Sequence, residues 1–113
     1  MSQRIAFSDE VPGVITPEGA QRRLLSHGGG MMVVEFTFEA GTVAPVHSHP
    51  HEQVGYVVSG ELTLIMEGHD DELLRPGSSY YVAPDVRHGV IIHAPTVLVD
   101  VFTPLREDFL PAR

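Results

Sequence analysis

The chain is 113 residues long, 42% of its residues are hydrophobic, and its formal charge at neutral pH is −8. This length and apolar content suit one globular domain with its own core and exclude a disordered tail. The acidic balance argues against nucleic acid as a partner, because a negative surface repels phosphate backbones. No apolar run is long enough to cross a bilayer or to act as a secretory signal, so we expect a cytoplasmic protein with no membrane partner.

Cysteine and lysine are both absent, and all seven residues counted as Lys or Arg are arginines. The lack of cysteine excludes disulfides, thiolate metal ligands and a cysteine nucleophile. The lack of lysine excludes Schiff-base chemistry.

The start of the chain is rich in turn-forming residues, namely Pro12, Gly13, Pro17 and Gly19. This composition predicts an N-terminal arm with at most a brief edge strand. We therefore divide the chain into an arm at residues 1–19, a β domain at residues 20–103 and a tail at residues 104–113 that packs on this domain.

Short segments separated by glycine or proline predict strands throughout the β domain. The clearest is residues 32–38, in which apolar and polar residues alternate with the period of a half-buried strand. No segment has the period of an amphipathic helix of ordinary length. Short strands at regular intervals predict an antiparallel all-β sandwich or barrel. The predicted strands are residues 20–27, 32–38, 54–58, 62–66, 80–82, 88–92 and 96–102.

His47 and His49 are one residue apart in a further segment that we predict to be a strand. Side chains at i and i+2 of a strand share a face, so both imidazoles can point at one ion. Neutral imidazole is a common ligand of divalent transition metals. Pro50 cannot donate a ladder hydrogen bond and should interrupt the strand. Alternation then leaves open which following residue returns to the inner face: His51, Glu52 or Gln53.

Asp100 is the only charged residue of the apolar segment 97–102. Alternation places it on one face with Leu98 and Phe102. A carboxylate buried without a partner costs several kcal/mol, so this position indicates an arginine or a metal-bound water nearby. An enclosed carboxylate is a candidate for moving protons. The alternative is an edge strand on which Asp100 faces solvent.

Three valines form the opposite face of the same segment: Val97, Val99 and Val101. If they faced water on an edge strand, they would form an exposed apolar stripe. Another layer or another subunit should therefore cover them, and we expect a symmetric homodimer.

The stretch 41–60 resembles the first sequence motif of the cupins, small jelly-roll (double-stranded β-helix) barrels that hold a metal in their lumen. Its matching residues are Gly41, His47, His49, Gln53 and Gly60, with Gln53 where most members carry glutamate. Residues 77–88 resemble the second motif, in which His88 takes the place of the third histidine ligand. Three positions depart from that motif: Ala83 stands for proline, Asp85 for glycine and Ile92 for asparagine. The resemblance implies an all-β, single-domain cupin barrel.

Within the cupins, two segments resemble the KdgF family of pectin-degradation proteins: residues 47–53 and 99–110. Members of that family linearise 4,5-unsaturated monouronates, the sugars left after lyases cut pectin or alginate. The resemblance implies one divalent transition metal of unspecified identity (Ni, Zn, Fe, Mn or Co), held by His47, His49, Gln53 and His88. It also implies a small anionic sugar as substrate, contacted by Asp100, Phe102 and Arg106.

Two assignments stay open on the sequence. Glu52 competes with Gln53 as the fourth ligand, because a carboxylate is a better donor than an amide oxygen. Arg106 either binds a uronate carboxylate with its planar fork or forms a surface ion pair with Glu107 or Asp108.

The expected function is ring opening of an unsaturated monouronate. The metal would act as a Lewis acid, Asp100 would pass the proton, and Arg106 would fix the substrate carboxylate. One alternative keeps the metal site and uses iron and dioxygen. Another is a non-catalytic module that binds a sugar or a metal.

Overall fold

The computed structural model describes residues 2–111, which form ten strands and two single-turn 3-10 helices. The strands are β1 (Val14–Ile15), β2 (Gln21–His27), β3 (Met32–Phe38), β4 (Val43–His47), β5 (Glu52–Ser59), β6 (Leu62–Met66), β7 (Glu72–Leu74), β8 (Ser79–Val82), β9 (His88–Ile92) and β10 (Thr96–Thr103). The 3-10 helices are η1 (Ser8–Glu10) and η2 (Glu107–Phe109). No helix in this part of the chain is long and apolar enough to span a membrane.

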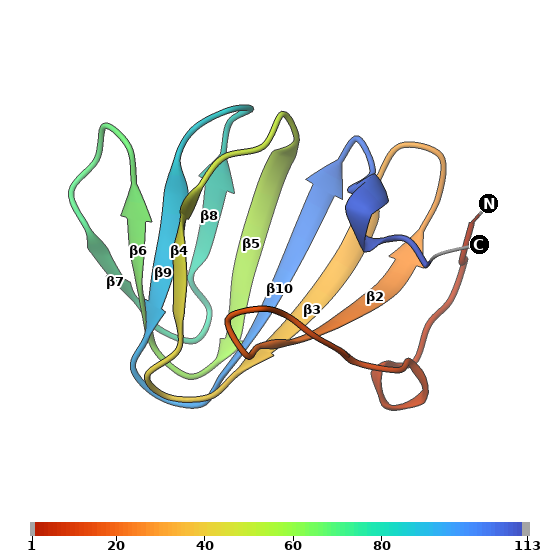
Figure 1. The fold of residues 1–113 in the computed structure, drawn as a ribbon, viewed down its shortest axis with the longest axis horizontal. Helices are drawn as coiled ribbons and strands as arrows, with labels where there is room; N and C mark the ends of the chain where they lie inside the picture. The colour runs from red at the N-terminus through yellow and green to blue at the C-terminus, as the bar shows by residue number, and fades with distance from the viewer. Residues whose placement is uncertain (1, 112–113) are drawn as a thin grey trace.

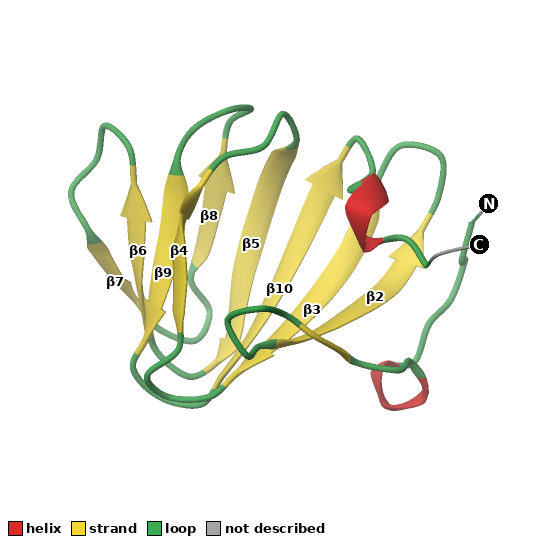
Figure 2. Ribbon diagram, in the orientation of Figure 1, coloured by secondary structure: helices red, strands yellow, loops and turns green. Residues whose placement is uncertain are grey.

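The strands form two antiparallel sheets that face each other (Figures 1 and 2). The larger has the order β1-β2-β3-β10-β5-β8 and the smaller has the order β4-β9-β6-β7. The prediction of an antiparallel all-β fold is confirmed, and every predicted strand is present with ends within two residues of the expected ones. The sequence does not predict β7, because three residues are too few to show alternation.

The N-terminal residues follow the edge and the outer face of the larger sheet. β1 pairs with β2 at the edge. Earlier in the chain, the Ser8 hydroxyl donates a hydrogen bond to Glu35 (2.5 Å), and the carbonyl of Val11 accepts one from the Arg23 guanidinium (3.1 Å). These contacts cover the outer side of β2 and β3.

The strand that carries Asp100 lies inside the larger sheet, between β3 and β5. Along β10 the residues alternate between buried and half-buried. Asp100 is only 3% exposed, so the alternative of a solvent-facing aspartate on an edge strand is wrong. The three valines of this strand form part of the outer face of a sheet, where they are half-buried, and do not form an exposed edge.

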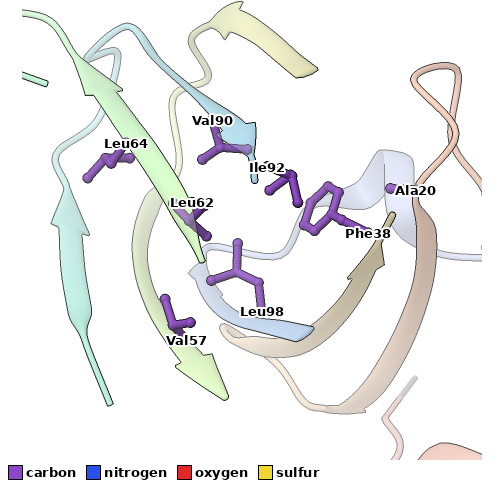
Figure 3. Packing of buried hydrophobic residues seen from close by; sticks show 8 residues of the cluster. All are labelled: Ala20, Phe38, Val57, Leu62, Leu64, Val90, Ile92 and Leu98. Carbon is purple, nitrogen blue, oxygen red and sulfur yellow. The ribbon is translucent and has the colours of Figure 1, made fainter. Parts of the chain in front are cut away.

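Two clusters of buried side chains fill the molecule. The first lies between the sheets and includes Leu62 and Ile92 from the smaller sheet and Leu98 from the larger one (Figure 3). The second joins the inner face of β3 and β10 to the C-terminal segment, where Phe109 packs against Phe102. The space between the two clusters is the site described next.

Candidate metal centre and substrate cavity

His47, His49 and His88 come together at one end of the smaller sheet. His47 is the last residue of β4 and pairs with His88, the first residue of β9. His49 lies two residues beyond the end of β4, so the prediction that both histidines belong to the strand is wrong for His49. One nitrogen from each ring lies within 4.8 Å of the other two. This spacing is compatible with a single ion bound by all three rings.

Backbone carbonyls orient all three rings in the same way. The Nδ1 atom of each ring lies within hydrogen-bond distance of a carbonyl oxygen, so Nδ1–H is the donor and Nε2 carries the free lone pair. The acceptors are the carbonyls of Pro45 (2.9 Å), His51 (3.1 Å) and Val86 (2.9 Å), for His47, His49 and His88 respectively. Three neutral imidazoles with their nitrogens this close together are a donor set that suits a divalent transition metal.

Burial keeps two of these rings neutral at physiological pH. Burial and, to a smaller extent, the nearby positive charge of Arg106 lower the pKa of His49 to about 4. Burial also lowers the pKa of His88. Because only neutral imidazole can bind a metal, both shifts favour the ligating form.

Gln53, and not Glu52, faces the histidines. Gln53 is 5% exposed, and its Oε1 lies 3.0 Å from Nε2 of His49. Both atoms are acceptors when Nδ1 of His49 carries the proton, and a shared cation would satisfy both of them. Glu52 is exposed on the opposite face and accepts a hydrogen bond from the Tyr81 hydroxyl (2.5 Å). A donor set of three imidazoles and one amide oxygen carries no charge of its own.

Asp100 lies beside this cluster on the inner face of β10. Burial raises its pKa to about 6, against the opposing effects of hydrogen bonds from Gln53 and Tyr80 and of the charge on Arg106. Gln53 therefore contacts Asp100 as well as His49. Asp100 remains mostly ionised at neutral pH, but its pKa is close enough to neutrality for proton transfer.

Tyr80 reaches Asp100 across an intervening strand. The register places Asp100, Gly55 and Tyr80 side by side on β10, β5 and β8. The Tyr80 hydroxyl donates a hydrogen bond to Oδ1 of Asp100 at 2.9 Å. A Cβ atom added to Gly55 would overlap the Tyr80 ring, so this glycine leaves the space that the ring occupies. The sequence analysis misses Tyr80, although a lone glycine inside a strand is a known sign of close approach.

Arg106 forms an ion pair with Asp108, which is one of the two alternatives left open by the sequence. Its guanidinium donates two hydrogen bonds to Asp108, from Nη2 at 2.9 Å and from Nε at 3.1 Å, and its side chain is only 13% exposed. The same group lies 5.2 Å from the ring centroid of Phe102 and 4.2 Å from that of Phe109. Arg106 is therefore paired with Asp108 and also lines the interior.

A cavity of about 250 Å³ opens between the two core clusters. Its walls come from both sheets, from residues 16–18 of the N-terminal arm and from the C-terminal segment. Of the seven predicted site residues, His49 alone is not in the lining, and it packs against His47 and His88. The six that line the cavity are His47, Gln53, His88, Asp100, Phe102 and Arg106. The structure thus brings every predicted site residue into one region.

The fold and the site define the class of protein. A two-sheet β-barrel with three histidines converging at one end is the architecture expected from the two motifs, and the cupin domain model matches residues 34–102. The chain therefore belongs to the cupin family.

Within the cupins, the chain is similar to the KdgF proteins. It is 31% identical to the pectin degradation protein KdgF of Dickeya dadantii over 110 residues, which cover 96% of this chain and 99% of that one, and it belongs to the same family. The structure of KdgF from Halomonas sp. superposes with a TM-score of 0.86 at 31% identity, covering 94% and 99% of the two chains. An RmlC-like cupin from Shewanella frigidimarina gives a TM-score of 0.91 at 34% identity, covering 96% and 97%.

The contact between Tyr80 and Asp100 can be tested by a double-mutant cycle. Tyr80→Phe removes a hydrogen bond to a charged group and should cost about 1.5–3 kcal/mol in the free energy of unfolding. Gly55→Ala displaces the same ring and should lose the same bond, so the double variant should be less destabilised than the sum of the two. Urea unfolding of the four proteins measures this coupling. Tyr81→Phe, on the outer face, is the matched control and should have a small effect. If the losses in the free energy of unfolding for Tyr80→Phe and Gly55→Ala were additive, the proposed contact would be contradicted.

Burial of the Asp100 carboxylate predicts a pH-dependent stability of the metal-free protein. Its pKa is raised from 3.8 to about 6 on folding, so the native state loses stability as the pH rises through this range. Asp100→Asn removes this loss. One pKa unit corresponds to about 1.4 kcal/mol. The free energy of unfolding of the variant should therefore be higher than that of the wild type by on the order of 3 kcal/mol at neutral pH, and nearly equal to it near pH 4. Urea unfolding in chelator across this pH range measures the difference, which must vary with pH for the account to hold.

Proposed function

We propose that this protein is a metal-dependent enzyme that converts a 4,5-unsaturated monouronate into its open-chain keto form. The observation that carries the proposal is the enclosed carboxylate of Asp100, next to a three-histidine cluster and within the electrostatic reach of Arg106. The family relationship to pectin degradation proteins supports an unsaturated uronate as the substrate class. Sugars derived from pectin and from alginate share this chemistry.

In this proposal the metal ligands are His47, His49, Gln53 and His88. When bound, a divalent ion held by this neutral donor set supplies Lewis acidity to oxygen atoms of the substrate. Gln53 also suits this position because of its contact with Asp100. Its amide can donate a hydrogen bond to Asp100 while its oxygen faces the cluster, whereas a glutamate would place a second negative charge beside the buried carboxylate.

The proposed reaction moves protons without a redox change. Asp100 takes the proton of the C1 hydroxyl, the bond between C1 and the ring oxygen breaks, and C1 becomes an aldehyde. The ring oxygen stays on C5 as an enolate, and delivery of a proton to C4 converts it to a ketone. The proton taken from oxygen equals the proton returned to carbon, so Asp100 ends in its starting state.

Phe102 and Arg106 are the proposed substrate contacts. Phe102 presents an apolar ring next to Asp100 on the same face of β10, and such a surface suits the face of a sugar. Arg106 is held over that ring and near His49 and Asp100, where its positive charge favours an anionic substrate. A cavity of about 250 Å³ lies just below the ~300–1,000 Å³ typical of ligand pockets, so it suits a single sugar.

Turnover and metal dependence test this function directly. Loss of the ultraviolet absorbance of the unsaturated uronate should require metal and should stop in chelator. Asp100→Asn should reduce kcat by about 10²- to 10⁴-fold, while metal analysis should show an unchanged content. Glu52→Gln, on the exposed face, should behave as the wild type. Full activity of Asp100→Asn would remove its proposed role, and turnover that required dioxygen would favour an iron-dependent dioxygenase instead.

We further propose that the protein is a homodimer formed through the outer face of β5, β8 and β10. Four side chains there are about half exposed: Val54 (46%), Tyr56 (49%), Val58 (49%) and Tyr81 (52%). They continue the outer valines of β10, and the N-terminal arm covers only the neighbouring part of the sheet. A flat apolar patch on one sheet is complementary to its own copy about a two-fold axis.

Substitution within this patch tests the dimer. Tyr56→Glu places a charge at its centre and should convert the dimer to a monomer in size-exclusion chromatography with light scattering. Leu73→Glu is the control, because Leu73 is even more exposed (62%) but lies on the smaller sheet. A wild-type protein that elutes as a monomer at all concentrations would exclude the interface.

A further inference from the structure

Arg22 and Arg23 are adjacent in sequence but lie on opposite faces of β2. Arg22 pairs with Phe36 and lines the cavity, together with residues 16–18 of the arm. Arg23 pairs with Glu35, and its side chain contacts the Val11 carbonyl and Gln21. The sequence analysis assigns no role to either residue. Only Arg22 can meet a ligand in the cavity.

Phe109 holds the guanidinium of Arg22 in place. The central carbon of this group lies 4.2 Å from the ring centroid of Phe109, the same distance as that of Arg106. A guanidinium stacked on an aromatic face keeps its N–H donors directed sideways in its own plane. The donors of Arg22 are thus available to a planar acceptor in the cavity.

Arg22 has no counter-ion among residues 2–111. No carboxylate there lies within 4.0 Å of its guanidinium, and its side chain makes no hydrogen bond to any of these residues. By contrast, two donors of Arg106 are already bound to Asp108. The chain contains 15 acidic residues and only seven arginines, so partners are plentiful. A half-buried cation that lacks one is well suited to bind an anion that enters from solution.

Arg22 and Arg106 lie over the same ring, that of Phe109, but have different neighbours. The charge of Arg106 shifts the pKa values of His49, His88 and Asp100, whereas no other described arginine does. Arg22 instead pairs through its backbone with Val14 of the N-terminal arm. Arg22 therefore lines the cavity beside the N-terminal arm, whereas Arg106 lies near the histidines and Asp100.

We propose that Arg22 is the residue that binds the carboxylate of the substrate. This inference rests on the proposed function and differs from the sequence-based expectation, which gives this role to Arg106. In an unsaturated uronate the carboxylate on C5 and the hydroxyl on C1 lie on opposite sides of the ring oxygen. A carboxylate held by Arg22 therefore directs the C1 hydroxyl toward Asp100 and the histidines. Arg106 stays paired with Asp108 and contacts the middle of the sugar.

Steady-state kinetics on an unsaturated monouronate test the proposal with three variants. Arg22→Gln removes a charge-assisted contact and should raise KM by about ten- to a hundredfold, with kcat within about threefold of the wild type. Arg22→Lys keeps the charge but loses the fork, and should give an intermediate KM. Arg23→Gln is the matched control on the outer face and should match the wild type. Thermal melting verifies that all three variants are folded.

Binding of D-galacturonate and of neutral D-galactose, followed by NMR, separates this inference from the proposed function. Arg22→Gln should weaken galacturonate binding as strongly as it raises KM and should leave galactose binding unchanged. Unaltered KM and galacturonate affinity in Arg22→Gln would overturn the inference and leave the proposed function intact. If the wild type turned over no unsaturated uronate, the function would fail. In that case, selective loss of galacturonate binding in Arg22→Gln would still support the carboxylate site. If the wild type itself did not bind galacturonate, the inference about Arg22 would be overturned.

Discussion

Asp100 is a carboxylate inside a β-barrel, and its neighbours are arranged to stabilise it there. It is only 3% exposed, so Tyr80 and Gln53 supply hydrogen bonds and Arg106 supplies a compensating charge. Burial still raises its pKa to about 6, which makes it both a stability cost and a usable base. The barrel tolerates this cost because the carboxylate lies where the two core clusters leave a cavity.

Gln53 links the acid to the histidine cluster. A single amide can donate to Asp100 and present its oxygen beside His49, which a glutamate cannot do. This dual contact offers a physical reason for glutamine at a position where the cupin motif usually has glutamate. Backbone carbonyls complete the arrangement by fixing the tautomer of each histidine, so the geometry of the cluster is set by the chain itself.

The turn before His88 shows how the chain accommodates a departure from the cupin motif. Asp85 stands where the motif has glycine, and its φ of 67° lies in the left-handed region that aspartate tolerates better than most residues. Its backbone N–H donates a hydrogen bond to the carbonyl of His49 at 2.8 Å. Aspartate at this position thus adopts a conformation that glycine favours, and its hydrogen bond connects the turn before β9 to His49.

The sequence by itself determined most of the strands, the antiparallel class and the shared face of Leu98, Asp100 and Phe102, because these depend on local alternation and on glycine and proline turns. Only the tertiary structure decided between Glu52 and Gln53, since the chain leaves the strand at Pro50 and its return depends on pairing with β10. Packing also decided that β10 is an interior strand, that Tyr80 crosses Gly55 to reach Asp100, and that Arg22 shares Phe109 with Arg106. Such contacts join residues far apart in sequence, and no local pattern encodes which distant strand or segment lies opposite.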